Sequence, residues 1–238
     1  AHLLRGQAGL AGGDPHGWYN LSVGEQYTRG INACRVGAAE AAAGCFTDEP
    51  DRDGYRNKNL VLNGGYRWDN EAQLTANWLR SLGEVHFDGS FQNRSRTVQQ
   101  AAGAALRFNP MPAWQSTFSA GQNLDRYDNY KDRDFTGYIY SRRNQASWQN
   151  DLSLAENQLL TLGLDWQDEH IDSDTGFLAD RRHDTGAFAQ YQATIDGHEL
   201  AVSARRDDNS QYGQHDTGAV AWGYRFAGGL KLLARYGL

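Results

Sequence analysis

Strand-length blocks in which apolar and polar residues alternate recur along almost the whole sequence. Residues 59–68 show the pattern, because every second side chain is apolar or small: Leu60, Leu62, Gly64, Tyr66 and Trp68. The positions between them are polar or glycine, with Val61 as the exception. A period of two is typical of a β-strand with one apolar and one polar face. The sequence therefore predicts an all-β protein.

The length of the blocks and their aromatic ends favour a strand that crosses a membrane. We expect blocks of roughly 9 to 15 residues, and roughly 9 to 11 suffice to cross a bilayer at a tilt. The mean hydropathy of −0.72 does not oppose this interpretation, because a barrel exposes only alternate residues to lipid. No stretch approaches the roughly 18 apolar residues of a spanning helix. A soluble sandwich or barrel has the same period and remains the alternative.

Long and short connections alternate between the expected strands. Tight turns are predicted at residues 69–70, 109–111, 196–197 and 228–229, and long polar loops at 29–55, 84–94, 124–134, 167–181 and 209–215. All long loops then emerge at one end of the sheet, as in outer-membrane barrels. The prediction is a single domain over 1–238: a transmembrane antiparallel up-and-down β-barrel with long extracellular loops and short periplasmic turns. It has about 12 strands, near 2–10, 16–28, 56–68, 71–83, 95–108, 112–123, 135–149, 153–166, 182–194, 197–208, 216–227 and 229–237.

The charged residues exclude two classes of function. The net charge is −6, and Lys and Arg are scattered along the strands, which argues against a nucleic-acid surface. No nucleophile lies beside a base in a recognisable motif, so we expect no enzyme. A group of basic residues on the presumed inward face is interpreted as solvation of a lumen: Arg205, Arg225, Lys231 and Arg235.

Four segments in family order resemble the TonB-dependent cobalamin receptors of the bacterial outer membrane. They are residues 204–215 (ARRDDNSQYGQH), 18–22 leading into 28–33 (WYNLS, TRGINA), 48–55 (DEPDRDGY) and 163–167 (GLDWQ). The resemblance covers nearly the whole chain. It implies an outer-membrane location in contact with lipid, with cobalamin as the partner.

The resemblance also implies a shortened receptor. Family members carry an N-terminal plug domain with a TonB box and a barrel of twenty-two strands, and this sequence matches the first half of the barrel without a plug. Coupling to TonB is therefore not expected. A wall of twelve strands could close by pairing residues 2–10 with 229–237, which would give a passive pore. The alternatives are an inert fragment that needs a partner chain and a receptor barrel for a siderophore.

The same resemblance implies a calcium site in the long loops. Asp51 and Asp53 match a pair of carboxylates that binds Ca²⁺ in the related receptors, and Asp88 matches a third ligand. Closely spaced carboxylates suit Ca²⁺, which takes six to eight oxygen ligands. However, the loop at 84–94 is shorter than its counterpart, and a further carboxylate expected there has no match. A solvated acidic loop remains the alternative.

Two further pairs of loop residues are candidates for a disulfide and for ligand contact. Cys34 and Cys45 share a long loop that would face the oxidising exterior, so a disulfide is predicted. A metal or redox role is less favoured, because no His lies nearby and the spacing is not C-x-x-C. Tyr127 and Tyr130 lie in the acidic segment 124–134, where contact with cobalamin or sugar is weighed against plain loop surface.

Overall fold

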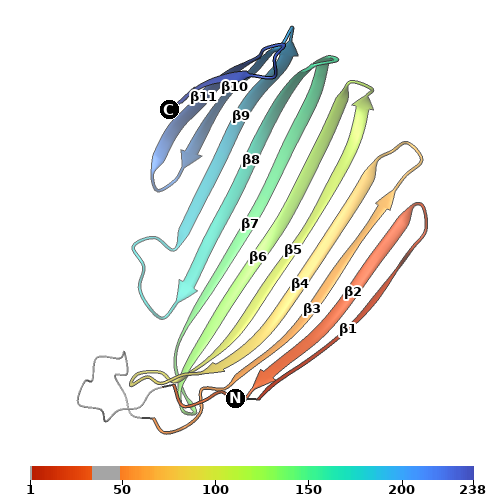
Figure 1. Cartoon of the computed structure of the whole chain (residues 1–238). Helices are drawn as coiled ribbons and strands as arrows, with labels where there is room; N and C mark the ends of the chain where they lie inside the picture. The colour runs from red at the N-terminus through yellow and green to blue at the C-terminus, as the bar shows by residue number, and fades with distance from the viewer. Residues whose placement is uncertain (1, 34–48) are drawn as a thin grey trace.

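The computed structural model describes residues 2–33 and 49–238, which form one antiparallel sheet in sequence order (Figure 1). In this part of the chain no helix is long and apolar enough to cross a membrane. The strands are β1 (Leu3–Gly13), β2 (Gly17–Thr28), β3 (Tyr55–Arg67), β4 (Gln73–His86), β5 (Arg94–Met111), β6 (Trp114–Lys131), β7 (Asp134–Ala155), β8 (Gln158–Ser173), β9 (Arg181–Ile195), β10 (His198–Asn209), β11 (Gly213–Arg225) and β12 (Lys231–Gly237).

The prediction of about twelve up-and-down strands is confirmed, but two of the predicted long loops are wrong, and a third, 167–181, is shorter than predicted because β8 continues to Ser173. Residues 124–131 continue β6, and β7 begins at Asp134, so only a tight turn joins the two strands. The second error is at 209–215, where the side-chain oxygen of Asn209 accepts hydrogen bonds from the backbone N–H groups of Gln211 (3.0 Å) and Tyr212 (3.2 Å) and closes a turn. The acidic composition of these segments predicted loops. The strands instead continue into water with their backbone hydrogen bonds intact, and there they are polar on both faces because water lies on both sides.

The central strands are longer than a bilayer requires. β7 has 22 residues, whereas roughly 9 to 11 suffice to cross. The excess of β5 to β8 lies at the end of the sheet that also carries the long β2–β3 connection, at the bottom of Figure 1. The strands therefore extend a rigid wall beyond the lipid on the predicted extracellular side.

Cross-strand register separates an apolar face from a polar face across the whole sheet. Leu10 lies opposite Leu21, Leu21 opposite Leu62, and Leu62 opposite Trp78. The same face continues through a second row on the later strands: Phe118, Trp148, Leu164 and Ala187. These cross-strand neighbours form a continuous apolar surface. The predicted lipid-facing positions on β3, β4 and β8 are thus confirmed to share one face.

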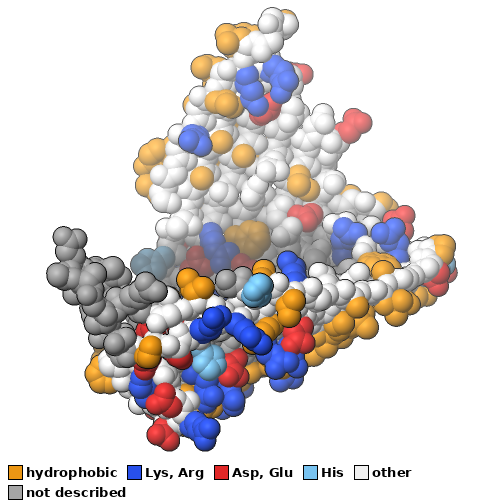
Figure 2. Space-filling view, turned by 60° about the horizontal axis from the view of Figure 1, so that its bottom comes forward, with side chains coloured by type: hydrophobic (Ala, Val, Ile, Leu, Met, Phe, Trp, Pro, Cys, Tyr) orange, Lys and Arg blue, Asp and Glu red, His pale blue; other side chains and the backbone are white. Residues whose placement is uncertain are grey.

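The opposite face is polar and lines the hollow of the curved sheet. Asn20, Asn63 and Asn77 are successive neighbours on this face, and the hydroxyls of Ser119 and Ser147 are 2.7 Å apart. The sheet curves into a trough, which Figure 2 shows from the loop end. Among the described hydrophobic residues only Ala193 is buried, so the sheet has no dry core of its own. Lipid on the convex side takes the place of a core.

The sequence left open whether a twelve-stranded barrel closes on itself, and the structure shows that it does not. In the described part of the chain, β1 pairs only with β2 and β12 only with β11. The two edge strands lie on opposite sides of the trough (Figure 1). The curvature of the twelve strands is too gentle to bring the edges together, so the sheet is open.

We expect spin labels at neighbouring positions on β3 to report opposite environments in lipid vesicles. In a variant with Cys34 and Cys45 replaced by Ser, a label at Leu62→Cys should collide mainly with oxygen, because it faces lipid. A label at Asn63→Cys should collide mainly with a water-soluble nickel chelate. Power-saturation electron paramagnetic resonance measures both quantities, and equal accessibility at the two positions would contradict the face assignment.

Candidate functional site on the concave face

A hollow of about 580 Å³ lies on the concave face, in the half of the wall nearer the long loops. It spans β4 to β9, and its walls combine apolar side chains such as Leu79 and Ile171 with the amides of Gln99 and Asn123. A concave surface with apolar walls and a few polar groups is the usual form of a ligand site.

An ion-pair ladder forms one wall of this hollow. Arg143 on β7 lies opposite Glu169 on β8, and Glu169 lies opposite Arg182 on β9. Both guanidinium groups bind the same carboxylate, one at each oxygen. The side chain of Glu169 is 17% exposed, whereas those of Arg143 and Arg182 are 47% and 35% exposed. The ladder thus carries one excess positive charge and unused N–H donors, which suit an anionic group of a ligand, while the carboxylate of Asp125 adds one negative charge to the same hollow.

A second ion-pair ladder, nearer the short turns, carries a net negative charge, in contrast to the ladder around Glu169. Arg205 donates to Asp165 at 2.6 Å and to Asp207 at 2.9 Å, so two carboxylates share one guanidinium. Its guanidinium also lies 5.7 Å from the ring centroid of Phe188. Phe188 lies directly over Gly163, where an added Cβ would come within 2.2 Å of the ring. Only glycine leaves room for the ring that supports Arg205.

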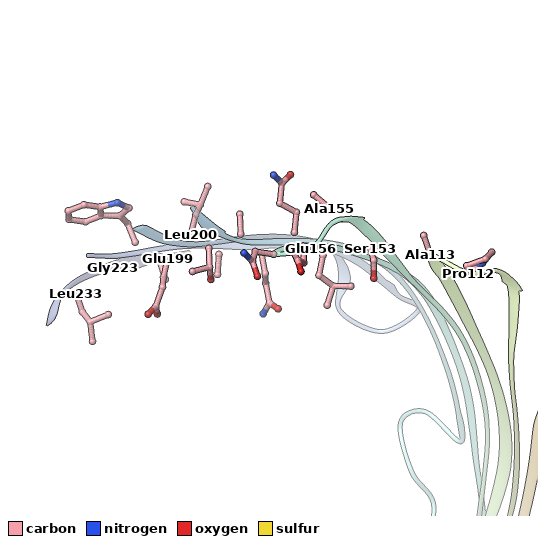
Figure 3. Close-up of a pocket in the computed structure, with 18 residues that line it drawn as sticks. Pro112, Ala113, Ser153, Ala155, Glu156, Glu199, Leu200, Gly223 and Leu233 are labelled. Carbon is pink, nitrogen blue, oxygen red and sulfur yellow. The ribbon is translucent and has the colours of Figure 1, made fainter. Parts of the chain in front are cut away.

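The basic residues predicted to face inward do so. Arg225 and Lys231 bind Glu199 at 3.4 and 2.5 Å, and Arg235 lies four residues beyond Lys231 on the same face. Figure 3 shows Glu199 and Leu233 on the concave side of the sheet and Leu200 on the other, at a broad, open hollow of about 900 Å³ near the short turns. The polar face therefore runs the full height of the wall.

Glu49 ties three loop segments together at the outer end. Its carboxylate accepts hydrogen bonds from the backbone N–H of Gly89 (3.1 Å) and the amide of Asn93 (3.3 Å), and it pairs with the ammonium of Lys131. Lys131 also donates to the carbonyl of Gly89 at 2.9 Å. The hydrogen bond from Lys131 lowers the pKa of Glu49 below its usual value. This cluster fixes the β4–β5 loop and the end of the β2–β3 connection against the β6–β7 hairpin.

The two tyrosines have different positions. Tyr127 lies on the concave face of β6, two residues beyond Asp125, which lines the hollow. Tyr130 is held elsewhere: the guanidinium of Arg94 lies 4.6 Å from its ring centroid, and Phe135 packs edge-on against it at 5.7 Å. Of the two predicted contact residues, only Tyr127 is therefore placed to reach a ligand in the trough.

Of the predicted calcium ligands, Asp53 already accepts a hydrogen bond from the backbone. One oxygen of Asp53 accepts the backbone N–H of Ala33 at 2.7 Å and so closes the base of the β2–β3 connection. Within residues 2–33 and 49–238, no three His, Cys, Asp or Glu side chains are grouped as a metal ion would require. Calcium binding by Asp51, Asp53 and Asp88 stays a prediction. The predicted disulfide of Cys34 and Cys45 lies outside the described residues.

The ladder around Glu169 is not predicted from the sequence. Arg143, Glu169 and Arg182 each alternate with outward-facing residues, so their common face could have been inferred from the period. Their contact could not, because it depends on the register of three strands.

The comparisons with known proteins agree with this geometry. No protein-family model matches the chain. Vitamin B12 transporter BtuB of Photobacterium profundum is 28% identical over 239 residues, which cover 95% of this chain and 39% of the transporter. The corresponding protein of Vibrio cholerae is 25% identical over 247 residues and 97% of this chain.

The chain is homologous to the vitamin B12 transporters. It spans about two fifths of the length of these relatives. Solved structures show the same fold. A ferric enterobactin receptor of Pseudomonas aeruginosa superimposes on this chain with a TM-score of 0.74 at 18% sequence identity. The match covers 98% of this chain and 41% of the receptor. The FrpB iron transporter of Neisseria meningitidis superimposes with a TM-score of 0.75 at 10% sequence identity, and the match covers 99% of this chain and 44% of the transporter. The similarity in sequence to these transporters and in fold to these receptors agrees with a chain that forms an outer-membrane β-barrel wall.

Acid should loosen the outer loops through Glu49. Because the pKa of Glu49 is lowered in the folded state, its ionised carboxylate stabilises the loop cluster at pH values above the ordinary pKa of about 4.3. This stabilisation of the cluster is lost as the pH falls through the lower, folded-state pKa. We expect amide exchange at Gly89 to become faster at the acid end, relative to intrinsic rates. The variant Glu49→Gln should exchange about fivefold faster at neutral pH and lose the pH dependence. An unchanged pH dependence in this variant would show that another group controls the loops.

Calorimetric titration with Ca²⁺ tests the calcium prediction. The full chain in detergent should release or absorb heat at or below millimolar Ca²⁺. The variants Asp51→Asn and Asp53→Asn should each weaken binding, whereas Asp132→Asn, in the β6–β7 turn, serves as a matched control. The absence of heat at millimolar Ca²⁺ would refute the site.

Proposed function

We propose that this chain forms part of the wall of an outer-membrane transport barrel whose concave face binds cobalamin or a related large solute. The observation that carries the proposal is the similarity to vitamin B12 transporters along 95% of the chain, which includes the strands around the hollow. Partial coverage of these relatives means that transport itself would require the rest of a barrel.

The chemistry of the hollow supports a large solute with mixed polarity. Cobalamin carries one phosphodiester and several amide side chains around an extended ring. The excess guanidinium charge beside Glu169 suits the phosphodiester, and Gln99 and Asn123 can pair with amides. Tyr127, exposed on the same face, can stack on a flat ring.

A ferric siderophore is the second candidate. Its support is the same positive wall, which also suits the negative charge of a ferric chelate. The structural similarity to siderophore receptors concerns the fold alone. The two candidates differ in charge, so they predict different responses to a change in the ladder.

Two other interpretations have less support. A passive twelve-stranded pore requires β1 and β12 to pair, and they do not. An inert piece that needs a partner chain fits the open edges but leaves the charged ladders unused. We expect no enzymatic activity, and no coupling to TonB by residues 1–238 themselves.

Binding of cyanocobalamin by the purified chain in detergent tests the proposal by isothermal titration calorimetry. The double variant Arg143→Gln/Arg182→Gln should weaken binding about tenfold, because it removes the donors to the anionic group. The variant Glu169→Gln keeps both guanidinium groups and should strengthen binding of an anion. Arg107→Gln, a concave-face change at the hydrogen bond to Gln73, serves as the control.

The outcomes separate the candidates. Binding of cyanocobalamin that responds to the double variant and not to the control supports the first proposal. Binding of a ferric chelate alone, with the larger gain in Glu169→Gln, supports the second. Heat from neither ligand, with circular dichroism showing intact strands, would contradict both.

A further inference from the structure

Residues 49–54 form a strap across the outer ends of β3 to β6. The strap begins at Glu49, which contacts the β6–β7 hairpin, and it ends where β3 begins at Tyr55. Between these ends, the carbonyl of Gly54 accepts the backbone N–H of His86 on β4 at 2.9 Å. Since neighbouring strands lie about 4.8 Å apart, the strap spans the three intervals from β3 to β6, or about 14 Å. The contact of Glu49 therefore decides whether the far end of the strap is held.

The ammonium group of Lys131 lies among oxygen atoms of two other segments. It pairs with the carboxylate of Glu49 and donates a hydrogen bond to the carbonyl of Gly89 at 2.9 Å. The backbone N–H of Gly89 in turn donates to the same carboxylate at 3.1 Å. The strap, the β4–β5 loop and the β6–β7 hairpin thus meet in a closed triangle, and the ammonium group supplies its positive charge.

Asn93 of the β4–β5 loop fixes the hairpin on both sides of Lys131. Its backbone N–H donates to the carbonyl of Tyr130 at 2.9 Å, and its side-chain oxygen accepts the backbone N–H of Asp132 at 2.7 Å. Its amide nitrogen donates to the carboxylates of Asp132 (2.9 Å) and Glu49 (3.3 Å). These bonds position Lys131 in the hairpin, so its ammonium group is held where the strap arrives.

The charges of this cluster require a cation. Glu49 and Asp132 each bring a carboxylate to the amide of Asn93, and Lys131 balances one of the two charges. The side chains of Glu49 and Lys131 are only 16% and 30% exposed, so water screens their attraction less than on an open surface. Removal of the ammonium group would leave two carboxylates beside each other and the carbonyl of Gly89 without this donor. Such a loss is costly, because a partly buried charge would lose its partner.

We propose that Lys131 is a built-in cation that joins the strap, the β4–β5 loop and the β6–β7 hairpin, so that these segments assemble without a bound divalent ion. Carboxylate and carbonyl oxygens from separate loops are the ligands that a hard metal ion such as Ca²⁺ brings together. Here a tethered ammonium group, a compact point charge with three donors, binds oxygens of the same kinds. The proposal concerns Glu49 and Gly89 and not the predicted calcium ligands. It is also independent of the proposed cargo, which the concave hollow would bind.

Amide hydrogen exchange at Gly89 tests the proposal, because this N–H exchanges when its bond to Glu49 opens. NMR spectroscopy follows the exchange in the full chain, in detergent with excess EDTA. The unmodified chain should keep its slow exchange, whereas Lys131→Gln should exchange about tenfold faster, because it lacks the ammonium group. The matched control Lys231→Gln removes the same charge and breaks an ion pair with Glu199 at the other end of the wall, and it should leave exchange at Gly89 unchanged.

Chemical rescue of Lys131→Ala tests whether the occupant must be an ammonium group. Propylammonium replaces the atoms that this variant lacks, and at about 100 mM it should slow exchange at Gly89 about threefold relative to the same concentration of sodium chloride. Three outcomes would overturn the proposal: exchange in EDTA that is as fast in the unmodified chain as in Lys131→Gln, an equal acceleration in the control, or no advantage of propylammonium over sodium. The first of these would assign the joining role to a divalent ion.

Discussion

The structure depends on one constraint: in lipid, every backbone N–H and C=O group must find its partner within the sheet. Each strand from β2 to β11 pairs on both sides in unbroken antiparallel register, apart from local irregularities near strand ends. The ladder replaces the dry core of a soluble domain, which this chain lacks. The same constraint makes the two outer edges, β1 and β12, costly in lipid.

Given the ladder, a period of two assigns a role to each face. The convex side carries rows such as Leu10, Leu21, Leu62 and Trp78, which need lipid. The concave side carries ion-pair ladders, each built by three adjacent strands around Glu169, Arg205 or Glu199. Such ladders combine rigidity with charge, so the wall can hold fixed positive and negative zones at different heights along the trough.

The extracellular half of the wall is more regular than its composition suggests. Segments rich in Asp, such as 124–134, were expected to be loops, yet β6 and β7 continue to Lys131 and from Asp134. The alternation was present in that segment, but both faces are polar there because water lies on both sides. Residue propensity and polarity therefore predicted a loop in this segment, whereas the alternating period and the pairing with neighbouring strands make it a strand. Glu49 then joins the remaining loops to this rigid hairpin through Lys131.

The sequence by itself determined the strand number, the up-and-down order, the two faces and the resemblance to cobalamin receptors, because alternation and turn residues are local properties. The inward position of Arg205 and Arg225 also followed from the period alone. Only the tertiary structure decided that the sheet stays open and that Arg143 and Arg182 share Glu169. These features depend on curvature and on the register of several strands, and the pattern within a single strand contains neither.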